Sequence, residues 1–141
     1  MPEKSTIRKA REDLRQGKSP TTAAGEFVHE EIEHVRRGKH GARSARQAIA
    51  IGLSKARRAG VPLPAPKKGQ TSEKTRRSAE RAYEVGQGKR KAKAPARRRA
   101  RATSKALQRE GRSAASKGAL SKQAQRAAAR RRRTWARTQS R

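Results

Sequence analysis

The chain has 141 residues, of which 40 are lysine or arginine and 11 are aspartate or glutamate, so its formal net charge is +29 at pH 7. Alanine accounts for 26 of the apolar residues, whereas leucine, isoleucine, valine and phenylalanine together number only 14. So few large apolar side chains exclude a single core for the whole chain and predict extensive disorder. The excess of positive charge predicts a polyanionic partner.

Other absences narrow the class of protein. There is no cysteine, so neither a disulfide framework nor a thiolate metal site is expected. No apolar run approaches the roughly 20 residues of a membrane-spanning helix. The first residues, Met1 to Lys4, lack the apolar region of a secretory signal. We therefore expect a cytoplasmic protein with no membrane partner.

The first predicted helix spans about residues 3–16. Ile7 and Leu14 fall on one face of this helix, and Gly17 follows as a stop signal. We assign residues 1–19 to this helix and the linker after it.

A second helix is predicted to begin near Ser19 and is clearest over residues 26–37. Val28, Ile32 and Val35 repeat there at helical spacing. Its glutamates lie in the early turns of this stretch and two arginines close it, which is the order that the helix dipole favours.

A third helix is predicted over about residues 44–59, with Ser44 as its N-cap. Small residues alternate with Ile49 and Leu53 along its apolar stripe and permit a close approach to the second helix. The two helices predict a helical hairpin module over residues 20–60. Such a module is marginal, because below about 40 residues a core alone is seldom sufficient.

The remainder of the chain is predicted to lack a core. Residues 61–71 contain alternating prolines and are interpreted as an extended linker and a domain boundary. Residues 72–141 form a basic tail, in which segments 72–85, 102–109 and 122–137 have helix-forming composition. The last two segments have no apolar face, so we expect them to be disordered until anions bind. The predicted fold class is mostly α with extensive disorder: a small helical hairpin module plus a cationic low-complexity tail.

The basic clusters of the tail are the clearest functional signal. Eight of the thirteen residues from 89 to 101 are lysine or arginine, and a run of four arginines lies near Trp135. Cationic arms neutralise phosphates and release counterions, which supplies most non-specific nucleic-acid affinity. Trp135 is a candidate for stacking on an unpaired base, or else a lone exposed aromatic. The predicted nucleic-acid-binding residues are Lys89, Arg90, Lys91, Lys93, Arg97, Arg98, Arg99, Arg101, Arg126, Arg130, Arg131, Arg132, Arg133, Trp135 and Arg137.

No metal, cofactor or catalytic site is predicted. His29 and His34 stand five residues apart, about 140° around a helix, so both cannot face one ion. The pairs His29/Glu33 and Glu30/His34 stand four residues apart and are interpreted as ordinary pairing on a helix surface. The glycines at Gly86 and Gly88 lack the spacing and the preceding strand of a phosphate-binding loop. No Ser/His/Asp set is evident on so small a scaffold. We therefore expect the protein not to be an enzyme.

The third predicted helix carries the segment Gln47-Ala48-Ile49-Ala50-Ile51-Gly52-Leu53-Ser54, after a basic turn at residues 38–41. With these features residues 26–60 resemble a small bacterial family of unknown function whose members share a basic lead-in and a similar helix. The chain departs from that pattern in its acidic second helix and its arginine-rich tail. The resemblance implies a bacterial source and supplies no reaction or binding residue. In composition the tail is similar to linker-histone tails and to bacterial histone-like proteins.

These observations predict non-specific DNA binding by the tail, as in a nucleoid-associated or histone-like protein. RNA or ribosome binding is one alternative, since ribosomal proteins also carry long basic extensions. The other is a protein-interaction module in which the helix over residues 44–59 docks a partner. Self-association or capture of a protein partner through residues 26–59 is a further expectation.

Overall fold

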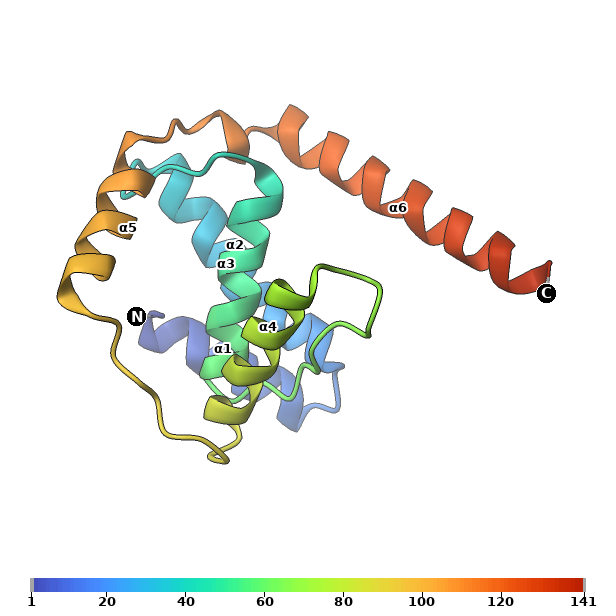
Figure 1. Ribbon diagram of the computed structural model, residues 1–141, viewed down its shortest axis with the longest axis horizontal. Coiled ribbons are helices and arrows are strands. Elements are labelled where there is room, and N and C mark those ends of the chain that lie inside the picture. The colour runs from blue at the N-terminus through green and yellow to red at the C-terminus, as the bar shows by residue number, and fades with distance from the viewer. Residues whose placement is uncertain (1, 141) are drawn as a thin grey trace.

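The computed structural model describes residues 2–140 and contains six α-helices within that range (Figure 1). In chain order they are α1 (Lys4–Arg15), α2 (Pro20–Arg36), α3 (Ala45–Arg58), α4 (Glu73–Gly86), α5 (Arg97–Arg109) and α6 (Lys117–Gln139). A short 3-10 helix, η1 (Ser113–Ala115), precedes α6.

The ends of the first three helices follow local sequence signals. The Ser19 hydroxyl accepts a hydrogen bond from the Thr22 amide at 3.2 Å and caps α2. The Ser44 hydroxyl caps α3 in the same way, with the Gln47 amide at 3.2 Å. Gly17 follows α1 with a φ of +77°, the left-handed conformation in which helices commonly end. The three predicted N-terminal helices are confirmed, and α2 extends further toward the N-terminus than its clearest segment.

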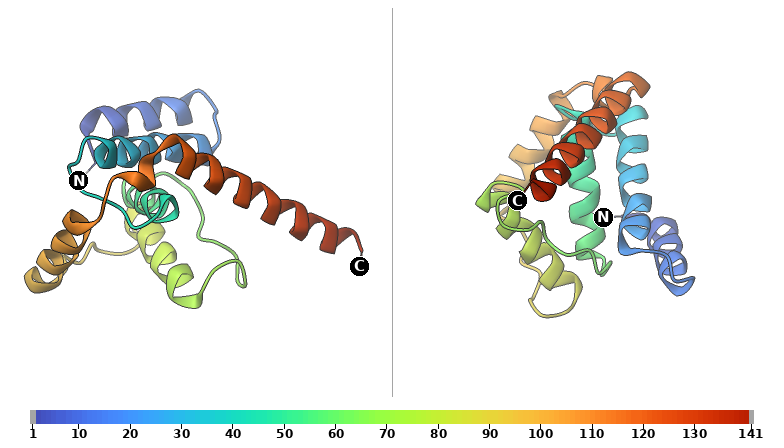
Figure 2. Two further views of the ribbon diagram at one scale, coloured as in Figure 1. Left: turned by 90° about the horizontal axis from the view of Figure 1, so that it is seen from above. Right: turned by 90° about the vertical axis from the view of Figure 1, so that its right-hand side faces the viewer.

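The first four helices pack in chain order, with α1 on α2, α2 on α3 and α3 on α4 (Figure 2). The first core cluster is centred on Phe27, which is fully buried. The other buried members of this cluster are Ala10, Ala23, Ala24, Ala56 and Val61. Alanine side chains let helix backbones approach closely, so a core forms from few large apolar residues. Because alanine contributes in this way, the core is larger than the composition predicts.

The proline-rich segment after α3 runs along the helices. Val61 is 4% exposed, and Leu63 packs against the first core cluster. The Arg57 guanidinium donates hydrogen bonds to the carbonyl oxygens of Leu63 and Pro64, at 3.2 Å each. Burial lowers the pKa of Arg57, although a guanidinium stays protonated at neutral pH. These contacts hold the segment in place so that α4 folds back onto α3.

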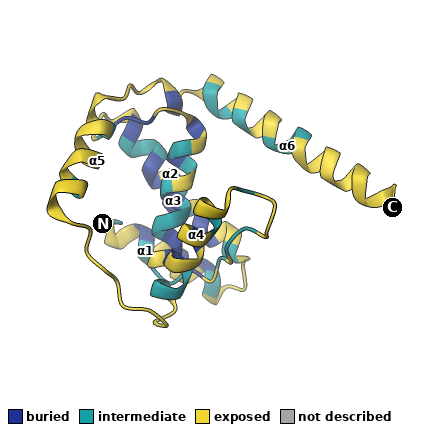
Figure 3. Cartoon of the chain, in the orientation of Figure 1, coloured by how far each residue is buried: buried dark blue, intermediate teal, exposed yellow. Residues whose placement is uncertain are grey.

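The basic tail is folded, and the predicted extensive disorder is wrong. Residues 97–109 form α5 and residues 117–139 form α6. The Ser116 hydroxyl accepts a hydrogen bond from the Ala119 amide at 3.1 Å and caps α6. The tail is rich in strong helix formers. Attachment of the segment before α6 to the other helices provides the start that an isolated helix lacks. Figure 3 shows α5 and the far half of α6 as exposed, in contrast to α2 and α3.

Residues 107–116, the tail anchor, attach the basic tail to the loop between α2 and α3. The Gly41 amide donates a hydrogen bond to the Leu107 carbonyl oxygen at 2.8 Å. The Ala42 amide donates one to the Gly111 carbonyl oxygen at 3.2 Å. This attachment was not predictable from the sequence, because it joins positions some seventy residues apart without any local pattern.

The second core cluster also includes residues of the tail. Ala114 and Ala115 of η1 are buried in it. Their partners in the cluster are Val35, Ala42 and Ala48. In addition, Arg36 Nε donates a hydrogen bond to the Ala115 carbonyl oxygen at 2.9 Å. The tail therefore completes the core that α2 and α3 begin.

Replacing Gly41 with alanine is expected to release the tail anchor. A Cβ at this position would overlap the Glu110 carbonyl group, and overpacking of this kind costs about 1–3 kcal/mol. We expect the amide hydrogens of Ala42 and Ala115 to exchange with solvent about ten times faster, as measured by NMR. Gly111→Ala is the control, since a Cβ there has no described atom within 4 Å. Equal exchange rates in the two variants would contradict this role of Gly41.

Candidate nucleic-acid interface

The positive charge of the first 90 residues is partly neutralised by ion pairs within the chain. The lysines and arginines in these pairs are Arg15, Lys18, Arg36, Arg37, Lys39, Lys55, Arg76, Arg77 and Arg90. The basic residues of α5 and α6 differ, because none of them pairs with a carboxylate anywhere in residues 2–140. Their charge is therefore available to an external anion.

The ion pairs at the surface are local. Arg76 donates two hydrogen bonds to the Glu73 carboxylate, at 3.2 and 3.0 Å. These bonds lower the pKa of Glu73 and raise the pKa of Arg76. In the same way, the hydrogen bond to Asp13 at 2.7 Å raises the pKa of Lys18. Such pairs add little to stability, but they occupy cations that would otherwise contact phosphates.

Helix α6 carries a continuous basic stripe. Its cations Lys122, Arg126, Arg130, Arg133 and Arg137 follow one another at steps of three or four residues, so all five lie on one face. We call these five residues the α6 stripe. The helix has 23 residues, about 35 Å in length, and Figure 1 shows it extending away from the other helices. Most of its circumference is thus open to a ligand.

The stripe begins in a groove between α6 and the start of α3. Arg43 and Arg46 line one side of this α3–α6 groove. The first three residues of the α6 stripe and Arg131 line the other. Ser44 and Ser116, which cap α3 and α6, also line it, so the positive N-terminal ends of two helix dipoles lie beside the cations. The groove is suited to phosphate.

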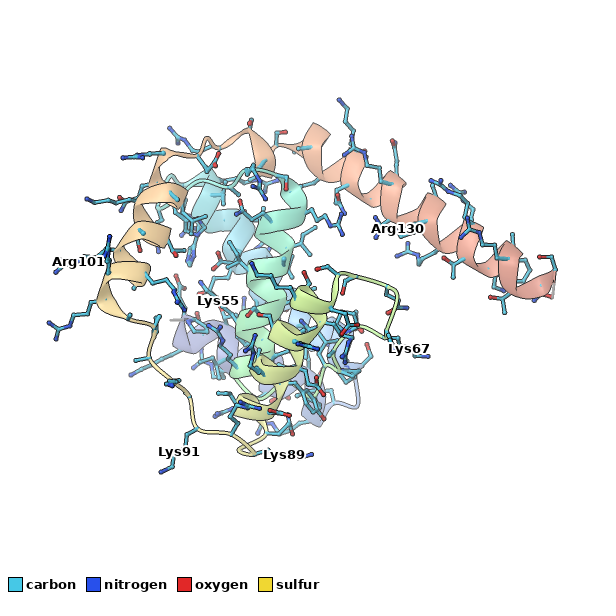
Figure 4. All side chains as sticks on the ribbon, in the orientation of Figure 1. Lys55, Lys67, Lys89, Lys91, Arg101 and Arg130 are labelled. Carbon is cyan, nitrogen blue, oxygen red and sulfur yellow. The ribbon has the colours of Figure 1, made fainter. Side chains whose placement is uncertain are left out.

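The predicted binding residues are all exposed, and the structure separates them into two groups. One group lies on the linker after α4 and on α5, and the other lies on α6. Figure 4 shows Lys91 and Arg101 pointing outward in the first group, far from Arg130 in the second. Within the first group, Arg90 is paired with Glu84 at 2.7 Å. Trp135 is 67% exposed near the end of α6.

Three cations of the groove are not among the residues predicted to bind nucleic acid. Lys122 follows the three- or four-residue spacing of the α6 stripe, which can be recognised in the sequence. Arg43 and Arg46 reach the groove only because the tail anchor sets the start of α6 beside α3. No local signal marks them.

Comparisons with protein-family models, with curated proteins and with solved structures found no match to this chain. The resemblance of residues 26–60 to a bacterial family stays a prediction. No helix in the described part of the chain is both long and apolar enough to cross a membrane.

Proposed function

We propose that this protein binds nucleic acid non-specifically, with duplex DNA as its first target, through the α6 stripe and the α3–α6 groove. The observation that carries the proposal is the absence of any carboxylate partner, within residues 2–140, for the basic side chains of α5 and α6. Unpaired arginines on a rigid helix bind phosphates and release condensed counterions.

Duplex DNA suits the shape of α6. The major groove of B-DNA is about 12 Å wide and admits an α-helix, and the arginines of the stripe are long enough to reach its phosphates from there. The other basic group, on the linker after α4 and on α5, points to another part of the surface (Figure 4). One molecule can then contact two duplex segments, as expected of a histone-like protein that acts in the cytoplasm at the nucleoid.

The protein-docking alternative is less favoured by the packing of α3. The small residues of its apolar stripe, Ala48, Gly52 and Ala56, are buried, and α2 covers this side of the helix. RNA binding shares the phosphate chemistry of the main proposal, and a direct comparison of ligands separates the two.

Binding is expected to weaken steeply with salt. Each neutralised phosphate adds about 0.9 to the slope of log K against log salt concentration. Replacing Arg126, Arg130 and Arg133 together with glutamine is therefore expected to lower the slope by about 2–3. The measurement is a fluorescence-anisotropy titration of labelled duplex DNA, single-stranded DNA and RNA over a range of salt concentrations.

The matched control removes the same charge from three ion-paired positions, Arg15, Arg37 and Arg76, again as glutamine. Its slope is expected to stay close to that of the unmodified protein. Equal losses in the two triple variants would mean that overall charge, not the α6 stripe, drives binding. Tighter binding to RNA than to duplex DNA would favour the ribosomal alternative. Substitution is preferred to deletion of the tail because η1 completes the core.

A further inference from the structure

A cluster of carboxylates and imidazoles lies between the N-terminal elements, apart from the basic residues of α5 and α6. Glu30 and Glu31 of α2 are 6% and 0% exposed. His34, on the same helix, lies against both of them. Glu3 reaches the cluster from the segment before α1, and His40 reaches it from the loop after α2. DNA binding gives no reason for these residues to be together.

The polar atoms in the His40 half of the cluster already have partners. Glu31 has one oxygen beside His40 Nε2, at 3.0 Å, and the other beside the ammonium group of Lys55. His40 Nδ1 faces the carbonyl oxygen of Gly41 at 2.9 Å. Both nitrogens of His40 thus lie beside oxygen atoms, and Lys55 already supplies a cation to Glu31.

In the His34 half of the cluster, two polar atoms have no hydrogen-bond partner within residues 2–140. His34 Nε2 and Glu30 Oε2 are buried and have no hydrogen-bond partner among the described residues. The side chain of Glu30 is 5% exposed. Buried polar atoms without partners are rare in folded proteins, and each one calls for an explanation.

The spacing of atoms around His34 Nε2 fits an ion. This nitrogen lies 3.6 Å from Glu3 Oε1 and 3.9 Å from Glu30 Oε1. Both separations exceed a good hydrogen bond. They are close to the roughly 3.4 Å that separates two ligand atoms bound at about 2.1 Å to a tetrahedral Zn²⁺. A backbone hydrogen bond from the Glu3 amide to Glu30 Oε1, at 2.7 Å, keeps the two acidic residues together.

The other nitrogen of His34 is placed to orient the ring. His34 Nδ1 lies 3.4 Å from Glu31 Oε1. A carboxylate at this nitrogen favours the tautomer that carries its proton on Nδ1 and leaves the lone pair on Nε2 directed at Glu3 and Glu30. This carboxylate–histidine arrangement is the usual second layer of protein metal sites.

We propose that Glu3, Glu30 and His34 bind one divalent transition-metal cation of the Zn²⁺ class, with water completing the coordination. One imidazole and two carboxylates form a ligand set that suits Zn²⁺ or Co²⁺ better than Mg²⁺. The Lys39 ammonium, 3.6 Å from Glu3 Oε1, moves into solvent when the ion enters. The ion links the segment before α1 to α2. It lies apart from the α3–α6 groove, so this inference does not depend on the proposed function.

The test is a titration of the full, chelator-treated chain with Zn²⁺ by isothermal calorimetry, together with Co²⁺ absorption spectra. We expect one ion per chain, the visible bands of tetrahedral Co²⁺, and a rise in the melting temperature when Zn²⁺ is added. Glu3→Gln and His34→Gln are expected to weaken binding at least about 100-fold. Glu3→Gln is the decisive variant, because its side chain is half exposed and its replacement does not disturb the core.

The matched control is His29→Gln, which removes an exposed histidine from the same helix. Its Zn²⁺ affinity is expected to equal that of the unmodified protein. The proposal is overturned if the unmodified chain does not bind Zn²⁺. It is also overturned if Glu3→Gln binds as tightly as the unmodified chain, or if His29→Gln loses as much affinity as His34→Gln.

Discussion

Replacing Lys55 with methionine is expected to destabilise the protein by about 3 kcal/mol, because it leaves a buried carboxylate without its ammonium partner. Glu31 is completely buried, and one of its oxygens pairs with the Lys55 ammonium. His40 Nε2 lies beside the other oxygen, at 3.0 Å. Methionine conserves the length of the lysine stem, so the loss reports on charge rather than on packing. Urea unfolding followed by circular dichroism measures the change.

Two controls separate the buried pair from the general effect of removing a lysine. Lys39→Met breaks a surface pair with Glu3, in which both side chains are about half exposed, and little change in stability is expected. The double variant Glu31→Gln/Lys55→Met has no carboxylate at position 31 and is expected to be more stable than Lys55→Met alone. If Lys55→Met were as stable as Lys39→Met, Glu31 would not depend on Lys55.

The helices of this protein were predictable where their signals are local. Ser19 and Ser44 cap their helices through amides three residues away, and Gly17 ends a helix through its own backbone conformation. Both kinds of signal are complete within one turn of the chain. The same holds for the basic stripe of α6, whose spacing requires only that the segment be helical.

The arrangement of the tail was not predictable in this way. Ala114 and Ala115 resemble the many exposed alanines of the tail in the sequence, and only their contact with Val35 distinguishes them. Repulsion between arginines favours an unfolded tail, but a few buried alanines and backbone hydrogen bonds at the anchor oppose it. The balance depends on contacts between distant residues, which composition does not contain.

The candidate nucleic-acid interface and the proposed metal site were likewise predictable only in part. His29 and His34 lie on different sides of α2, and His29 is exposed. The pair Glu30 and His34 was interpreted as ordinary pairing on a helix surface, but Glu30 is buried. No pattern in the sequence brings Glu3 to His34 across thirty residues of chain. Likewise, Arg43 enters the α3–α6 groove only through the folded position of α6.

Replacing Gly52 with alanine is expected to destabilise the protein by about 2 kcal/mol and to lower its melting temperature by roughly 5–10 °C. A Cβ at this position would lie 2.6 Å from Val28 Cα and 2.9 Å from Val28 N, which are backbone atoms of α2. Ala48 and Ala56, one turn away on each side, are fully buried as well, so α3 has no room to shift away locally.

The sign of this effect is what makes it informative. In the interior of an exposed helix, glycine to alanine is stabilising by about 1 kcal/mol, because alanine has the higher helix propensity. Gly25 of α2 provides that case, since a Cβ there has no neighbour within 4 Å in the described chain, and Gly25→Ala is expected to raise the melting temperature. Opposite shifts for the same substitution on the two paired helices require that the backbones of α2 and α3 touch at Gly52 and not at Gly25. A stabilising Gly52→Ala would show that α2 and α3 are further apart than this packing requires. It would also contradict the shared core of these helices, into which the tail anchor inserts.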